Sequence, residues 1–394
     1  MRQKIFVVLV LVVLLLGSSL LFSGRFSHAA QPEERLQPRS IGKLPPLVKV
    51  SLKLGVDQSN RTLQMSFGLS LRKHDQLNSL LQNLYDPSSS SYHQFLSVNQ
   101  FASEFAPTTD QQQAVINYLT SQGFTITQTY PNHMLIDFSG PQSLAERVFG
   151  VSINDYQSPD GRDFFANATQ PSFPAYLASY VTNISGLDDA NQFYHPPLPN
   201  KNAPTASPAA ASCPAASQTA YIPSQFAKAY NYNGLHSAGL QGEGQTVGVF
   251  ELDGYSQSDI QAYTQCFGGG SVPLQNVVLD GFNGQPGAGA IEVELDVEMI
   301  LSKAPHLSKL IVYEAPNTTQ GYNDEFARIV SDKTPVISVS WGDCESNMGQ
   351  QEANQENQYF QEARIDFHVL GGGGRLFGHA RSPTATNDPR HRRR

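Results

Sequence analysis

Glu292 and Asp296 are the residues of this chain whose type and spacing are best suited to chemistry. They are four positions apart, so on a helix their carboxylates lie on the same face. Two carboxylates held together in a low-dielectric cleft share a proton, which raises the pKa of one of them and gives an acid–base pair that works at low pH. The same pair also fits a solvated acidic helix face or a calcium-binding patch, so the two residues alone leave three interpretations open.

The segment that carries this pair, residues 291–301, has an ambiguous pattern. Apolar residues occupy every second position as far as Met299, which favours a strand. We interpret the segment as a helix because the alternation breaks after Met299 and the run stops at Lys303-Ala304-Pro305, which is typical of a helix C-terminus.

The segments around this helix predict an α/β arrangement that would position the pair. A short helix and buried strands with near-continuous apolar runs alternate through this part of the chain. The helix covers residues 258–266, and the strands cover residues 246–252, 277–279, 310–313 and 336–340.

The residues before it predict a separate α+β domain, with helices on one face of an antiparallel sheet. Period-two runs predict its strands, and runs of helical spacing predict its helices. The strands are 48–54, 62–71, 124–130, 134–138 and 151–156, and the helices are 75–85, 110–122 and 143–149. Thr109 is expected to cap the second helix. Six prolines from Pro196 to Pro214 then predict an open linker that is easily cut.

The first residues have the form of an export signal. Arg2 and Lys4 precede an unbroken apolar run over residues 5–16, and Ser27-His28-Ala29 offers a small-x-small cleavage site. We therefore expect a secreted protein. The apolar stretch can be extended to Phe22, which approaches the length of a membrane span, so an uncleaved N-terminal anchor is the alternative.

Charge and cysteine content narrow the class of function. The formal net charge is −8, and six arginines in the last 20 residues make the rest of the chain more acidic still. An acidic body argues against nucleic-acid binding, because a surface that follows phosphates needs clustered Lys and Arg. Three cysteines are too few for a disulfide scaffold. In an oxidising compartment Cys213 and Cys266 are a candidate pair, which leaves Cys344 alone.

Short motifs along the chain resemble those of the sedolisin (serine-carboxyl) peptidases of the kumamolisin type. Four motifs of the first domain resemble the activation prodomain of that family: Asp86-Pro87-Ser88-Ser89, Tyr92-His93-Gln94-Phe95-Leu96, Asn99-Gln100-Phe101 and Phe105-Ala106-Pro107-Thr108. Later motifs resemble the start of its mature enzyme, its first core strand, its Glu-x-x-x-Asp motif and its substrate-lining strand: Tyr221-Ile222-Pro223 with Phe226-Ala227-Lys228-Ala229-Tyr230-Asn231, Gly242-Glu243-Gly244-Gln245-Thr246-Val247 with Phe250-Glu251-Leu252, Glu292 to Asp296, and Ile337-Ser338-Val339-Ser340-Trp341-Gly342.

The resemblance implies a ferredoxin-like α+β prodomain followed by a subtilisin-like α/β catalytic domain that is truncated in this chain. It implies that Glu292 is the general base for a serine nucleophile and that Asp296 orients Glu292. It also implies that Ser340, Trp341 and Gly342 line the cleft and bond the substrate backbone, although Trp341 fits a plain core position equally well. Calcium is expected for the full-length family fold, at a site that this chain does not contain, so no metal ligand is assigned here.

Pattern and resemblance together divide the chain into six segments. They are a signal peptide, a spacer, the activation prodomain, a linker with the activation cleavage, the N-terminal part of the peptidase domain and an out-of-frame tail. In that order the segments cover residues 1–30, 31–47, 48–195, 196–216, 217–370 and 371–394.

The tail departs from the family pattern. The family also has a Gly-Asp-Ser oxyanion segment and a later Gly-Thr-Ser nucleophile, and the sequence contains neither. Residues 371–378 read Gly-Gly-Gly-Gly-Arg-Leu-Phe-Gly. Written with permitted codons and shifted by one base, they become Ala-Ala-Ala-Gly-Asp-Ser-Ser-Gly, which is similar to the family's oxyanion segment. We therefore expect a frameshift at this point.

The sequence thus predicts the precursor of a secreted, acid-acting serine-type endopeptidase, inactive as given because the oxyanion aspartate and nucleophilic serine are absent. Its expected partners are protein or peptide substrates, with no nucleic acid, and with a membrane only if the leader is uncleaved. The alternative is a non-catalytic protein whose first domain inhibits related peptidases or assists their folding. A third hypothesis, an acidic calcium-binding surface protein, predicts thermal stabilisation by calcium.

Overall fold

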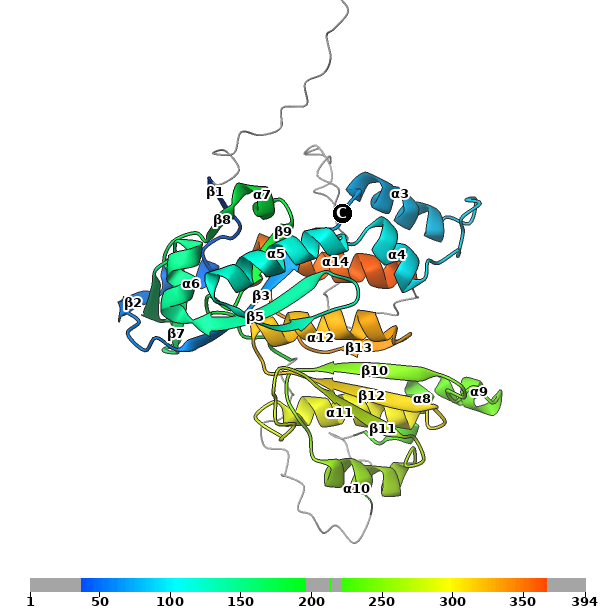
Figure 1. Ribbon diagram of the computed structural model, residues 1–394. Helices are drawn as coiled ribbons and strands as arrows, with labels where there is room; N and C mark the ends of the chain where they lie inside the picture. Colours follow the sequence, from blue (N-terminus) through cyan, green and yellow to red (C-terminus); the bar gives the residue numbers. More distant parts are fainter. Residues whose placement is uncertain (1–36, 196–212, 214–220, 367–394) are drawn as a thin grey trace, which may run out of the picture.

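The computed structural model describes residues 37–195, 213 and 221–366, and in it two sheets and their helices form successive layers (Figure 1). Helices α5 (Thr109–Gln122) and α6 (Gln142–Phe149) cover the outer face of an antiparallel sheet. Helices α12 (Thr319–Asp332) and α14 (Gln350–Asp366) lie between this sheet and a parallel one. The expected signal peptide, the tail and the linker apart from Cys213 lie outside the described residues.

The antiparallel sheet has β3 (Thr62–Leu69) and β5 (Leu135–Pro141) at its centre, with β4 (Thr125–Thr129) and β9 (Val181–Ser185) at its edges. All three strand pairs are antiparallel. Phe67 of β3 is fully buried, and its ring lies 5.0 to 5.7 Å from the rings of three further phenylalanines, Phe138, Phe149 and Phe173. This aromatic cluster fixes the helices on the sheet, because aromatic rings bury large areas in tilted and edge-on contacts.

Local side-chain bonds set where the helices begin. Helix α4 (Val98–Glu104) starts with a capping box between Ser97 and Gln100, and α5 starts with one between Thr108 and Gln111. The cap of α5 is therefore Thr108, and the expected cap Thr109 is the first helical residue. The prediction is wrong by one position, because Thr108 and Thr109 each have a glutamine three residues later, Gln111 and Gln112, and both therefore fit a capping box.

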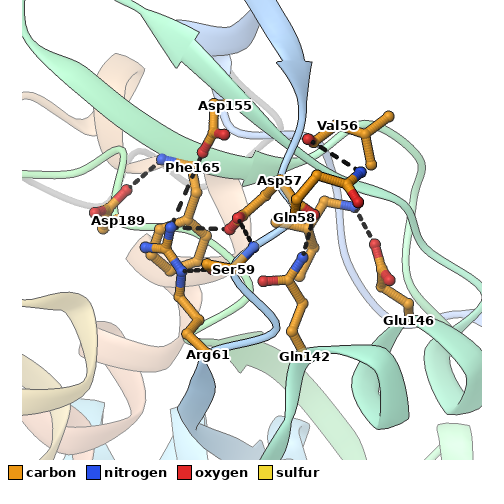
Figure 2. A network of polar contacts seen from close by, with 11 residues as sticks. Val56, Asp57, Gln58, Ser59, Arg61, Gln142, Glu146, Asp155, Phe165 and Asp189 are labelled. Carbon is orange, nitrogen blue, oxygen red and sulfur yellow. Dashed lines mark hydrogen bonds and ion pairs between the residues drawn. The ribbon is translucent and has the colours of Figure 1, made fainter.

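A second, three-stranded sheet contains β2 (Leu52–Val56), β6 (Ile153–Gln157) and β7 (Asp163–Asn167) in that order. Figure 2 shows the polar network that fastens it to the main sheet around Arg61. The Arg61 guanidinium lies 2.9 Å from Asp57 and 4.5 Å from the centre of the Phe165 ring, and Asp189 accepts the Phe165 N–H at 2.7 Å. The loop between β2 and β3 is thus tied to β7.

The structure differs from the expected spacer at residues 31–47. Strand β1 (Pro38–Ser40) pairs antiparallel with β8 (Ser172–Pro174), and Ile41 is only 4% exposed. The expected strand 48–54 is instead a 3-10 helix η1 (Pro46–Val50) followed by β2. The polar, proline-bearing composition of the segment does not predict this structure. The segment is ordered because it pairs with a strand from a distant part of the chain.

The parallel sheet has the order β11 (Leu274–Val278), β12 (Lys309–Glu314), β10 (Thr246–Glu251) and β13 (Ile337–Val339). Its lower face in Figure 1 is covered by α11 (Ala290–Lys303), against which α10 (Gln257–Phe267) packs. The helical interpretation of residues 291–301 is confirmed. Val293, Val297 and Leu301, at intervals of four, are the buried apolar residues of α11, whereas its alternate apolar residues Ile291 and Leu295 are exposed.

The prodomain segment contacts the rest of the chain through polar side chains on α14. Asn183 of β9 donates to Glu352 at 2.7 Å, and Asn132 donates to Glu362 at 2.9 Å. Gln358 accepts the Leu71 N–H at 2.8 Å. The two halves of the described chain therefore share one interface, and the protein is a mixed α/β structure with a parallel sheet.

The remaining elements of the described chain are five helices, of which α3 has twelve residues and the others are shorter. They are α3 (His74–Tyr85), α7 (Ala175–Ala178), α8 (Pro223–Ala229), α9 (Tyr232–Ser237) and α13 (Glu345–Met348). Within the described ranges, every helix is too short or too polar to cross a bilayer.

Candidate active site

The expected site residues meet at the carboxyl end of the parallel sheet. Strand β10 ends at Glu251, and β13 leads directly into Ser340, Trp341 and Gly342. Parallel strands place their carboxyl ends along one edge, where loops and side chains converge. Helix α11 brings Glu292 to the same edge from the face below.

Asp296 is held by Ser340. The Ser340 hydroxyl donates to Asp296 Oδ2 at 2.6 Å, so the first residue of the expected substrate-lining segment contacts the acid pair. Burial raises the pKa of Asp296 above its ordinary value, and the Ser340 hydrogen bond opposes this rise. The environment of Asp296 thus favours its protonated form more than water does.

Glu292 is buried, with 3% of its surface exposed, and it faces His195 at the end of the prodomain segment. The distance from His195 Nδ1 to Glu292 Oε2 is 3.4 Å. Burial raises the pKa of Glu292, the charge of Asp296 raises it further, and His195 opposes the rise. Glu292 and Asp296 are therefore close enough for their charges to interact, and Glu292 also contacts a third ionisable group, His195.

Glu251 is a further carboxyl group of the site that the sequence analysis did not assign. It is fully buried, and its Oε2 accepts the Trp341 indole N–H at 2.8 Å. Burial raises the pKa of Glu251 well above its ordinary value, and the charges of Asp296 and Glu292 add to the effect. The available signal was an acid at the end of a predicted buried strand, a position where a charge is costly unless it has a role.

Trp341 is buried, and Gly342 pairs with Tyr194. Trp341 is 3% exposed, so its ring is part of the core while its N–H serves the carboxyl cluster. Gly342 exchanges both backbone hydrogen bonds with Tyr194, at 2.8 and 3.0 Å, in an antiparallel bridge. The His195 ring stands edge-on to the Trp341 ring, with centroids 5.2 Å apart. Tyr194, next to His195, is thus joined to Gly342 by one antiparallel bridge.

Cys213 and Cys266, the candidate pair, are joined in a disulfide, and Cys344 is free and exposed. Among residues 37–195, 213 and 221–366, no group of three or more His, Cys, Asp or Glu side chains is arranged to hold a metal ion. The described site therefore offers acid–base groups and backbone hydrogen bonds.

Comparisons with known proteins agree with the motifs. Residues 50–190 match the family model "Pro-kumamolisin, activation domain". The chain is 30% identical to sedolisin of Pseudomonas sp. (strain 101) over 319 residues, which cover 78% of this chain and 51% of sedolisin. It is 28% identical to xanthomonalisin of Xanthomonas sp. (strain T-22) over 355 residues, which cover 83% of this chain and 41% of xanthomonalisin.

Kumamolisin of Bacillus sp. (strain MN-32) is 27% identical over 275 residues, which cover 67% of this chain and 48% of kumamolisin. The chain thus spans about half the length of the curated relatives it matches. The chain belongs to the sedolisin/kumamolisin family and carries its pro-kumamolisin activation domain.

Proposed function

We propose that this chain is the precursor of an exported, acid-acting serine-carboxyl endopeptidase, in which the prodomain holds the candidate site closed. The observation that carries the proposal is the strand pairing of Tyr194 with Gly342, together with the 3.4 Å contact between His195 and Glu292. A peptide substrate is bound in the same way when its backbone adds a strand to an exposed edge. The prodomain end therefore occupies the position that we assign to substrate.

In the proposed mechanism Glu292 is the general base. It takes the proton of an attacking serine hydroxyl and returns that proton to the leaving amine, while Asp296 shares the proton and orients Glu292. A catalytic base works best when its pKa lies near the working pH. The pKa of Glu292 is raised above its ordinary value, which suits a base that works in acidic solution. The described residues supply this acid–base half of the chemistry, and the serine is assigned to none of them.

The finer fold assignments belong to the same proposal. The order β3, α5, β4, β5, α6, β9, with β3 and β5 central, supports a ferredoxin-like prodomain. The parallel sheet with helices on both faces supports a subtilisin-like peptidase domain. We assign residues 48–195 to the first, place the activation cleavage in 196–216, and assign residues 217–370 to the second. Secretion, with an uncleaved anchor as the alternative, follows from residues 1–30.

Processing at low pH tests the proposal. The purified chain is incubated between about pH 3 and about pH 7, and the fragments are identified by mass spectrometry, with an internally quenched peptide as a second substrate. Cleavage between His195 and Tyr221 that is lost in Glu292→Gln supports the proposal. Equal cleavage in Glu292→Gln, or none in a chain whose reading frame includes a family nucleophile, contradicts it.

A second candidate function is inhibition or assisted folding of a related peptidase. It is favoured by the interface, because the prodomain side chains Asn132 and Asn183 donate to glutamate side chains of α14 and need no covalent link to that helix. Adding the full chain to active sedolisin at low pH distinguishes the two functions. Inhibition without cleavage of the added chain favours this second function, and turnover of the chain as a substrate excludes it.

A further inference from the structure

We propose that Asp253 is a positioning residue of this site, which fixes the start of helix α11 so that Glu292 is held against His195, whose ring lies edge-on to Trp341. The inference rests on the proposed role of Glu292 as the base. Asp253 acts through the backbone of the loop that precedes α11.

The Asp253 carboxylate gathers three backbone N–H groups from two segments. Its Oδ1 accepts from Gly254 at 2.7 Å and from Gly287 at 2.8 Å, and its Oδ2 accepts from Gly289 at 2.6 Å. Gly254 and Pro286 also form a parallel bridge. The carboxyl end of β10 is therefore clamped to the glycine-rich loop at both oxygens, with bonds of the length expected for an ionised acceptor.

The clamp replaces a local helix cap. The N-cap of α11 is Gly289, which has no side chain to accept a bond from the first turn. The first N–H groups of a helix need acceptors, and a carboxylate near them also interacts favourably with the helix dipole. Asp253 supplies this carboxylate from a different strand. Because the Glu292 N–H donates to the Gly289 carbonyl at 2.9 Å, Glu292 is one helical turn from the anchored residue.

The anchored glycine also sets the position of the indole. A Cβ atom on Gly289 would lie 2.4 Å from Cη2 of Trp341 and 3.1 Å from Oδ2 of Asp253. The indole thus rests on the bare backbone of Gly289 and reaches Glu251 with its N–H. Asp253 therefore holds Gly289 in place, and Gly289 in turn sets the distance between the start of α11 and Trp341.

Fluorescence of Trp341 gives a direct measurement, because it is the single tryptophan of the chain. The emission of the full-length protein is titrated with acid for the wild type, Asp253→Ala, Asp253→Asn and Glu292→Gln. The difference between wild type and Glu292→Gln isolates the part of the transition that reports Glu292. Asn283→Ala is the matched control, since the Asn283 side chain accepts the Gln285 N–H within the same loop and no bond from α11 or its N-cap.

We expect Asp253→Ala to move the Glu292 transition to lower pH by about 0.5 unit or more, because a loosened first turn admits water to the carboxyl group. Asp253→Asn keeps one acceptor oxygen and should shift it less, and Asn283→Ala should not shift it. A folded Asp253 variant, judged by circular dichroism, with the wild-type transition overturns the proposal. The proposal is also overturned if the emission of the wild type changes with pH in the same way as that of Glu292→Gln. If Asp253→Ala does not fold, Asp253→Asn decides. None of these results depends on peptidase activity, so failure of the proposed function is seen separately.

Discussion

Replacing Glu352 with glutamine should remove part of the fall in the free energy of unfolding that occurs as the pH rises. Glu352 lies at the interface between the prodomain segment and α14. Glu352 of α14 is 4% exposed, and it accepts hydrogen bonds from Asn183 at 2.7 Å and Asn323 at 2.6 Å. Burial raises its pKa from 4.5 to about 8, the Asn323 bond opposes the rise, and the charge of Glu356 adds to it. At neutral pH the folded protein therefore holds a proton on Glu352 that the unfolded chain has released.

The sign and size of the effect follow from proton linkage. Below about pH 4.5 both states carry the proton, so Glu352 contributes no pH dependence. Above that pH the unfolded chain ionises and the folded chain does not, so the folded state binds more protons and the free energy of unfolding falls. The fall ends near pH 8, where the folded group also ionises. At about 1.4 kcal/mol per pKa unit, Glu352 alone removes roughly 3 kcal/mol between about pH 5 and about pH 8.

Glutamine at position 352 stays neutral at every pH and keeps an oxygen for Asn183. Its amide group would face Asn323, whose Oδ1 has no hydrogen-bond partner among the described residues and accepts the new donor once the Asn323 amide rotates. We expect Glu352→Gln to resemble wild type near pH 5 and to be more stable than wild type near pH 8. Glu104→Gln, the same exchange at an exposed prodomain position, is the matched control.

Urea unfolding at the two pH values, followed by Trp341 emission and by circular dichroism, measures the difference. The control and wild type should lose the same free energy between the two pH values, and Glu352→Gln should lose roughly 3 kcal/mol less. Equal losses for wild type and Glu352→Gln would show that Glu352 is ionised in the folded protein, which refutes the reasoning from its burial.

Three further predictions concern the site itself. Ser340→Ala should raise the pKa of Asp296 further, because it removes the hydrogen bond at 2.6 Å that favours the charged form; a carboxyl-carbon NMR titration measures this, and an unchanged value contradicts it. Gly289→Ala should lower stability by about 1–3 kcal/mol, because its Cβ would lie 2.4 Å from Trp341; an unchanged urea midpoint and emission spectrum would contradict that contact. Millimolar calcium should leave the melting temperature unchanged, because no group of metal ligands is found in the described ranges; a rise would favour the calcium-binding hypothesis.

Much of the candidate site was predictable from local sequence. The spacing of Glu292 and Asp296, with the helix end at Lys303, was sufficient to place both acids on one helix, and α11 has both. The family motifs also singled out residues 340–342, which the structure brings to the same sheet edge. These features follow from short-range pattern, since helical spacing depends only on residues within a few turns.

Only the tertiary structure decided what surrounds the acid pair. Glu251, Asp253 and His195 reach the site from segments whose own patterns say nothing of Glu292, and strand β1 is held by pairing with β8 more than 130 positions away. Strand order in a parallel sheet determines which strand ends meet, and that order depends on long-range packing that local periodicity does not encode. The sequence by itself determined the pair, and the fold determined that a buried carboxyl group, a clamped loop and the end of the prodomain enclose it.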